Sequence, residues 1–264
     1  MLNVICGWDP KDSTSINRQI PDYESFLVEK LRGFKIGVVK ELMVKDIHPD
    51  VRSSVENVFG LAEDMGAEIS EISLPSLEYA LSVYYIIAPS EASSNLSRFD
   101  GVRYGYRSPG SATLRDMYKK TRSGGFGDEV KRRIMIGTYC LSSGYYDAYY
   151  EKAQLVRAKV TQDFKKAFEK FDVLVSPTSP TTAFKIGEKT DDPLRMYLSD
   201  ICTIPVNLAG LPAVSIPSGL AGDGLPVGFQ IIGNTLREDN VLRAAYCMER
   251  AIGFNENPVE IYDN

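Results

Sequence analysis

The strongest constraint on the fold of this chain is a strand–helix–strand unit between residues 34 and 74. Residues 34–39 form a short apolar run that predicts a strand, and residues 67–74 alternate in the same manner. Between them His48-Pro49-Asp50 predicts a helix start, because proline is favoured at the first helical position, and Gly66 predicts its end. The connection has about the length that a crossover in a sheet needs. The unit therefore predicts a sheet with helices packed on it.

Strands and long helices are interspersed along the rest of the chain. Their pattern predicts a layered α/β fold. We expect Pro89 to break or kink the first of these helices, because proline has no amide hydrogen to donate. Apolar spacing predicts helices over 77–99, 128–141, 145–171 and 238–252, and strands over 172–176, 213–217 and 225–233.

Composition limits the class of protein. With 264 residues, 44% hydrophobic and 25% charged, the chain has enough apolar residues for a folded protein of one large or two modest units. No stretch approaches the roughly 18 apolar residues of a membrane helix, and the first residues lack a secretory signal, so we expect a cytoplasmic protein without a membrane partner. A net charge of -5 with scattered basic residues argues against direct binding to RNA.

Common catalytic motifs are absent from the sequence. It has no Gly-x-Ser-x-Gly elbow, no phosphate-binding loop and no dinucleotide fingerprint. Its single histidine, His48, precedes Pro49, where a role at the helix start is favoured over general-base catalysis. Asp191 and Asp192 adjoin in a predicted loop and are interpreted as solvated. The four cysteines stand far apart and are interpreted as small buried residues, not as a metal site or disulfides.

Four segments carry a family resemblance. One of them, Thr203-Ile-Pro-Val-Asn207 and onward to Gly219, is rich in proline and glycine yet largely apolar, which predicts an ordered loop packed against a sheet; the others are 84–106, 128–150 and 176–184. Through these segments the chain resembles the amidase signature family, and within it the glutaminase subunits of bacterial tRNA-dependent amidotransferases. The likeness runs from about residue 2 to residue 254. It implies an α/β/α amidase-signature fold with a mixed sheet, incomplete in this chain, with residues 1–264 as a single domain.

The resemblance also implies a reaction and its partners. In that family a serine, helped by a second serine and a lysine, releases ammonia from L-glutamine. A transamidating partner, the B subunit, then uses ATP and Mg to amidate Glu-tRNA(Gln), while a small C subunit wraps around the glutaminase. The serine- and lysine-bearing region has no match here, so no catalytic residue is assigned, no cofactor is expected in this chain, and the chain alone is expected to be inactive. tRNA is expected to be bound through the partner protein.

Three residues match the substrate-binding positions of the family. Arg133 corresponds to the arginine that reads the α-carboxylate of glutamine, Asp200 to the aspartate that helps hold the amino-acid head group, and Tyr84 to a tyrosine of the same pocket. A guanidinium fork suits a carboxylate, and a carboxylate suits an ammonium group. The alternatives are an Arg133 in a helix-surface ion pair and an Asp200 that caps a turn.

Two other functions stay open at this point. The chain fits the C-terminal part of an amidase for another small amide, or a non-catalytic binding or scaffold module. The pairing of Arg133 with Asp200 favours an amino-acid substrate, because an amidase for hydrophobic substrates needs neither charge.

Overall fold

The computed structural model describes residues 1–44, 46–188 and 193–255. The chain divides into two compact units, the first made of Met1–Leu77 and Thr161–Asn264 and the second of Glu78–Val160. Organisation as a single domain stays a prediction. The pair Asp191 and Asp192 lies outside the described residues.

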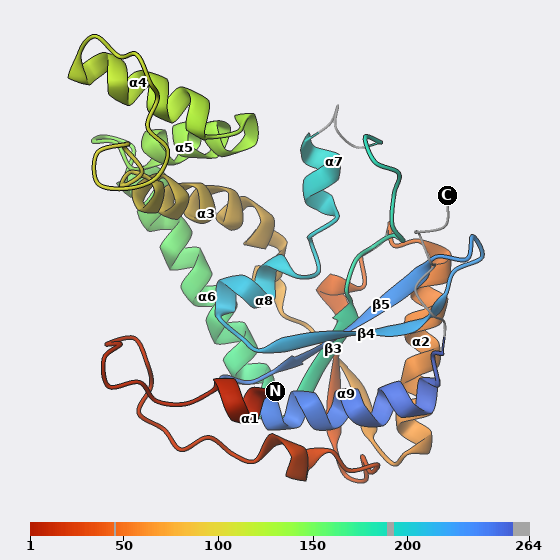
Figure 1. Ribbon diagram of the computed structural model, residues 1–264. Coiled ribbons are helices and arrows are strands. Elements are labelled where there is room, and N and C mark those ends of the chain that lie inside the picture. The colour runs from red at the N-terminus through yellow and green to blue at the C-terminus, as the bar shows by residue number, and fades with distance from the viewer. Residues whose placement is uncertain (45, 189–192, 256–264) are drawn as a thin grey trace, which may run out of the picture. The chain divides into compact units, whose positions relative to one another are not determined.

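A mixed sheet forms the centre of the first unit (Figure 1). Its strand order within the described residues is β2-β1-β3-β5-β4. β1 pairs in parallel with β2 and with β3, whereas β5 is antiparallel to both β3 and β4. The mixed α/β sheet expected from the family resemblance is therefore confirmed. The strands are β1 (Lys35–Val39), β2 (Glu68–Ile72), β3 (Val173–Pro177), β4 (Ala213–Leu220) and β5 (Pro226–Gly233).

The crossover between β1 and β2 forms as the sequence predicts. Its helix α2 (Pro49–Asp64) has proline in its first turn, and Nδ1 of His48 accepts a hydrogen bond from the Asp50 amide at 3.3 Å. This contact satisfies one of the amides that a helix start leaves unpaired. The helix ends at Asp64, and Gly66 just beyond it has a φ of 87°, which is costly for any residue with a Cβ. Residues at the two ends of α2 thus define the helix that connects the parallel strands β1 and β2.

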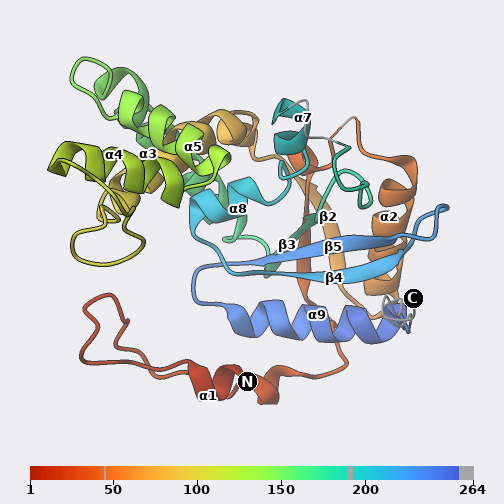
Figure 2. The same ribbon diagram turned by 45° about the horizontal axis from the view of Figure 1, so that its top comes forward.

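One face of the sheet packs against α2 and α9 (Glu238–Ile252). Figure 2 shows α9 on one side of β4 and β5 and α8 (Ile204–Ala209) on the other. Phe229 and Ile231 of β5 are fully buried against helix residues that include Val55 and Ala244. Each such side chain contributes roughly 1.5–3 kcal/mol through burial. Because side chains alternate along a strand, the neighbouring Gln230 points to the opposite face.

That opposite face carries the largest difference from the sequence-based expectation. The segment 203–219 is not a loop, because it contains α8 and most of β4. Pro205 lies in the first turn of α8, and Gly210 ends it with a φ of 67°. The prolines and glycines that indicated a loop therefore mark the ends of a short helix. α7 (Pro193–Leu198) precedes it.

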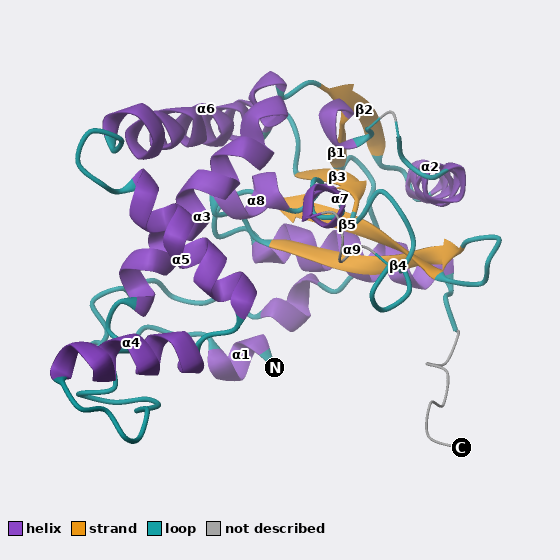
Figure 3. Cartoon of the chain, turned by 90° about the horizontal axis from the view of Figure 1, so that it is seen from above, coloured by secondary structure: helices purple, strands orange, loops and turns teal. Residues whose placement is uncertain are grey.

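The second unit is helical (Figure 3). α3 continues through Pro89 without a break, and α4 was not expected from the sequence. The helix expected over 145–171 begins with a π-helical turn at Asp147–Glu151 and ends at Ala167. The boundary between the units falls inside this last helix. The main helices are α3 (Ala80–Leu96), α4 (Leu114–Gly125), α5 (Asp128–Cys140) and α6 (Lys152–Ala167); short turns are α1 (Leu2–Ile5) and 3-10 segments at Tyr23–Phe26, Lys40–Leu42 and Pro75–Tyr79.

Candidate substrate-binding site

Close packing of α3 against α5 positions two of the three candidate residues. Gly137 of α5 lies against α3 so tightly that a Cβ there would overlap the Pro89 carbonyl oxygen and lie 2.7 Å from the Ser93 Cβ. The hydroxyls of Ser93 and Thr138 are 2.9 Å apart across the same contact. Arg133 lies one turn before Gly137 on α5, so it shares the face that meets α3.

The guanidinium of Arg133 bonds to groups on both helices. Its Nη1 donates to the Tyr84 hydroxyl at 3.1 Å, and its Nε donates to Oε1 of Glu129 at 3.0 Å. Among the described residues no hydrogen bond comes from its Nη2. The side chain is 34% exposed. Arg133 thus has a fixed orientation and a guanidinium edge that solvent or a ligand can reach.

Electrostatics keep this arginine charged. The pKa of Arg133 is raised above its ordinary value, chiefly by the hydrogen bond with Glu129 and also by that with Tyr84, although burial acts in the opposite direction. Glu129 pairs with Arg132 as well. The helix-surface ion pair considered from the sequence therefore exists, but such exposed pairs contribute little to stability. The bond to Tyr84 goes beyond it, because it joins two helices.

Asp200 lies in the first unit, within the turn 198–203 that joins α7 to α8, here called the Asp200 turn. Its carbonyl oxygen accepts hydrogen bonds from the amides of Thr203 and Ile204, both at 3.0 Å. The residue is exposed. These two hydrogen bonds connect the main chain of Asp200 to the first residues of α8. Convergence of Asp200 with Arg133 and Tyr84 on one ligand stays a prediction.

The Asp200 turn is anchored to the sheet unit through buried atoms. The thiol of Cys202, which is fully buried, donates to the Leu42 carbonyl at 3.6 Å, and burial raises its pKa to about 12. The Ser179 hydroxyl donates to the Ser199 carbonyl at 3.4 Å. In a third contact, the side-chain amide of Gln230 on β5 donates a hydrogen bond to the Cys202 carbonyl. The backbone on both sides of Asp200 is therefore held in place.

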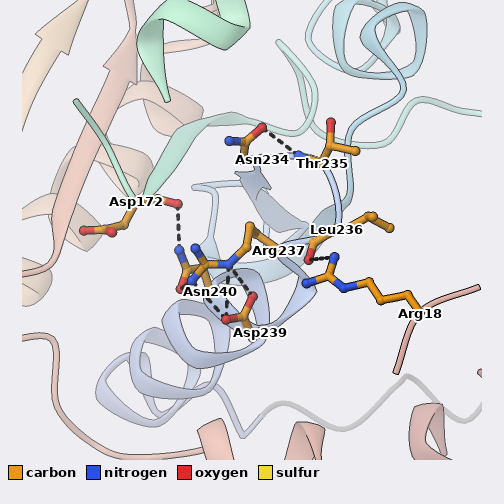
Figure 4. A network of polar contacts seen from close by, with 8 residues as sticks. All are labelled: Arg18, Asp172, Asn234, Thr235, Leu236, Arg237, Asp239 and Asn240. Carbon is orange, nitrogen blue, oxygen red and sulfur yellow. Dashed lines mark hydrogen bonds and ion pairs between the residues drawn. The ribbon is translucent and has the colours of Figure 1, made fainter. Parts of the chain in front are cut away.

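A separate polar network closes the start of α9 (Figure 4). Arg237 binds both carboxylate oxygens of Asp239 at 2.9–3.2 Å, and the Asn240 amide donates to the Asp172 carbonyl at 3.3 Å. Nη1 of Arg18 donates to the Leu236 carbonyl at 3.5 Å. A cavity of about 560 Å³ adjoins this network. Since Arg237 is neutralised by its own neighbour, the network accounts for the geometry of the helix start.

In the described ranges, no group of three or more His, Cys, Asp or Glu side chains is placed to hold a metal ion. Across the same ranges, no helix combines the length and the apolar character needed to cross a membrane.

Two residues of this region escaped the sequence analysis. Glu129 has a local signal, since it lies four positions before Arg133 in a predicted helix. Gln230 is the only polar side chain in the run Val227-Gly-Phe-Gln-Ile-Ile-Gly233, and a polar residue inside an apolar strand indicates a specific partner.

Comparisons with known proteins place the chain in a family. The amidase family profile matches residues 1–242. The glutamyl-tRNA(Gln) amidotransferase A subunit from Cyanothece sp. is 57% identical over 97% of this chain and 53% of that protein; its counterpart from Geobacter metallireducens is 56% identical with the same coverage. The chain thus spans about half the length of the curated relatives it matches.

Solved structures agree on the fold. The crystal structure of the glutamyl-tRNA(Gln) amidotransferase A subunit from Thermotoga maritima superposes with a TM-score of 0.73 at 41% identity, covering 95% of this chain and 49% of that one. A bacterial aryl acylamidase of the amidase signature family has a TM-score of 0.70 at 22% identity, covering 93% and 49%. The second likeness bears on the fold alone.

Proposed function

The chain belongs to the amidase signature family, and on that premise we propose that it supplies the L-glutamine-binding groups of a glutamyl-tRNA(Gln) amidotransferase A subunit. The observation that carries the proposal is the hydrogen bond between Arg133 and Tyr84. It orients a permanently charged guanidinium that can pair with the α-carboxylate of glutamine. Asp200 would pair with the α-ammonium group.

The reaction and the assembly belong to the same proposal. Ammonia released from glutamine would pass to a transamidating B subunit, which would use ATP and Mg to amidate Glu-tRNA(Gln), with a small C subunit as third member. tRNA would be reached through the transamidating partner. Support comes from relatives that are 57% identical over nearly all of this chain and are named for that amidotransferase.

Binding of L-glutamine by the 264-residue chain tests the proposal directly. Isothermal calorimetry should show saturable binding, and Arg133→Lys should weaken it about 10- to 100-fold, because lysine cannot form the two parallel bonds of a guanidinium fork. The matched control is Arg132→Lys, since Arg132 pairs with the same Glu129 at the helix surface. Equal loss in both variants, or no binding by the wild type, would refute the glutamine site.

A second assay separates catalysis from binding alone. The chain is mixed with a polypeptide covering the unmatched half of the Geobacter metallireducens relative, and ammonia release from glutamine is measured. Activity only in the mixture supports the glutaminase assignment. Release of ammonia from hydrophobic amides but not from glutamine would favour another amidase, and glutamine binding without any activity would favour a binding module.

A further inference from the structure

A buried amide connects the central sheet to the Asp200 turn. Gln230, on β5, is 4% exposed. Its Nε2 donates to the carbonyl of Cys202 at 3.1 Å and to the hydroxyl of Ser176 at 2.9 Å. Ser176 lies directly across from Gln230 on β3, is fully buried, and donates its own proton to the Pro177 carbonyl at 3.0 Å.

The arrangement fixes which end of the Gln230 amide faces the turn. A main-chain carbonyl such as that of Cys202 only accepts hydrogen bonds, and the Ser176 proton is already directed at Pro177. Both contacts therefore require the NH₂ end, and no rotated amide satisfies them. A buried polar group without a partner is strongly unfavourable, so these bonds hold the turn in one position relative to the sheet.

The hydrogen bond from Gln230 to Cys202 lies only two residues from Asp200, whose carboxylate is proposed to bind the ligand. Cys202 follows Asp200 closely, and the Asp200 carbonyl bonds to the amides of Thr203 and Ile204 just beyond it. Displacing the Cys202 carbonyl must therefore shift the main chain that carries Asp200. Gln230 itself points to the buried face and is remote from solvent, so it does not act by touching a ligand.

We infer that Gln230 is a positioning residue for the Asp200 carboxylate and thereby sets how strongly the site prefers ligands that carry an α-ammonium group. The inference rests on the proposed glutamine site. By this inference Gln230, a residue of strand β5, contributes to substrate specificity. A purely structural role for Gln230 would instead change the stability of the fold and leave the ranking of ligands unaltered.

The test compares two ligands that differ in one group. L-glutamine carries the ammonium group, whereas 4-carbamoylbutanoate is the same molecule without it. Isothermal calorimetry on the 264-residue chain gives the affinity ratio, defined as the affinity for L-glutamine divided by the affinity for 4-carbamoylbutanoate. In Gln230→Met, which keeps the length of the side chain and removes its donors, we expect this ratio to fall at least fivefold while binding of 4-carbamoylbutanoate changes less than twofold.

Controls separate this effect from general loss of folding. Ser218→Ala removes another buried hydroxyl of the sheet, which bonds to Ser54 at 2.8 Å and to the Val227 carbonyl at 3.2 Å. Since neither partner lies in the Asp200 turn, the affinity ratio of this variant should equal that of the wild type. Mass-spectrometric mapping of thiol labelling should show faster reaction of Cys202 in Gln230→Met. If that variant fails to fold, Gln230→Asn keeps the amide but is one methylene too short to reach Cys202.

The outcomes are distinct. Wild-type binding of glutamine with an unchanged ratio in both Gln230 variants overturns the positioning role and leaves the proposed function standing. Absence of glutamine binding in the wild type overturns the proposed function and this inference with it. A lower ratio with intact binding of 4-carbamoylbutanoate supports both.

Discussion

The Asp200 turn is held by neutral hydrogen bonds between buried atoms, whereas Arg133 is held by charged hydrogen bonds at a partly exposed helix surface. Cys202 in the turn and Gln230, its partner on β5, are at most 4% exposed, but Arg133 is 34% exposed and its partner Glu129 is 45% exposed. Water competes for exposed bonds and not for buried ones. The Asp200 turn is therefore positioned by the protein interior, whereas the guanidinium of Arg133 stays accessible to a ligand.

Substitution at the contact between α3 and α5 should give the largest effect at neutral pH. Gly137→Ala puts a methyl group against the Pro89 carbonyl, so the helices must separate. Overpacking of this kind costs about 3 kcal/mol, more than the roughly 1 kcal/mol that alanine contributes over glycine within a helix. Urea unfolding followed by circular dichroism measures the loss.

Gly60→Ala is the matched control for that variant. Gly60 lies within α2, is exposed, and has nothing within 4 Å of an added Cβ. The same substitution should therefore stabilise the protein by up to about 1 kcal/mol. Equal effects at the two positions would show that Gly137 is not needed for the approach of the helices that carry Arg133 and Tyr84.

Alkaline unfolding should report the burial of the Asp200 turn. Burial raises the thiol pKa of Cys202 from 9.0 to about 12, so the folded protein holds this proton more tightly than the unfolded chain. The resulting stabilisation is complete below about pH 9 and is lost as the pH rises toward 12. One such proton gives a slope of about -1.4 kcal/mol per pH unit in that window.

Cys202→Ala removes this contribution, so the decline of the unfolding free energy between pH 9 and 12 should become shallower. Cys6→Ala, at a partly exposed position outside the turn, is the control for the loss of a thiol as such. An identical slope in wild type and Cys202→Ala would mean that the turn opens readily to water, and the contrast between the two regions would then disappear.

Removal of the Tyr84 hydroxyl should have a smaller effect, and mainly on binding. Tyr84→Phe deletes the 3.1 Å bond to Arg133 but leaves the ring, which packs edge to face on Tyr85. A loss of about 1 kcal/mol in binding corresponds to about fivefold weaker binding of L-glutamine by calorimetry. Unchanged affinity would show that Glu129 alone orients the guanidinium.

The smallest change is expected for Glu129→Gln. The amide can still accept the bond from Nε of Arg133, but a negative charge near the proposed carboxylate site disappears. Because the pair is exposed, the gain should be no more than about 1 kcal/mol, seen as up to fivefold tighter glutamine binding that fades with added salt. Weaker binding in this variant would instead assign Glu129 to the site itself.

The fold was predictable where local signals are strong. Pro49 and Gly66 mark the crossover helix, and apolar runs mark the strands. α8 is not evident from the sequence, because Pro205 and Gly210 are as typical of a loop as of the two ends of a short helix. α4 was missed because it buries little, with Met117 and Thr121 as its buried residues.

The candidate site was predictable only through the family resemblance. Nothing in the composition around Arg133, Asp200 or Tyr84 distinguishes these residues from other polar side chains. The role of Gln230 depends on a contact between β5 and a turn almost thirty residues earlier, and a single sequence does not show which distant segments meet.

The insertion of the helical unit between β2 and β3 has a consequence for synthesis on the ribosome. β1 needs β3 as a neighbour, yet Lys35 and its partner Asp172 are 137 positions apart, and all of Glu78–Val160 must be translated in between. One flank of a nascent β1 therefore waits without a hydrogen-bonding neighbour while the helices emerge. Such an intermediate is prone to association with other chains, which makes translation speed and chaperone access determinants of yield.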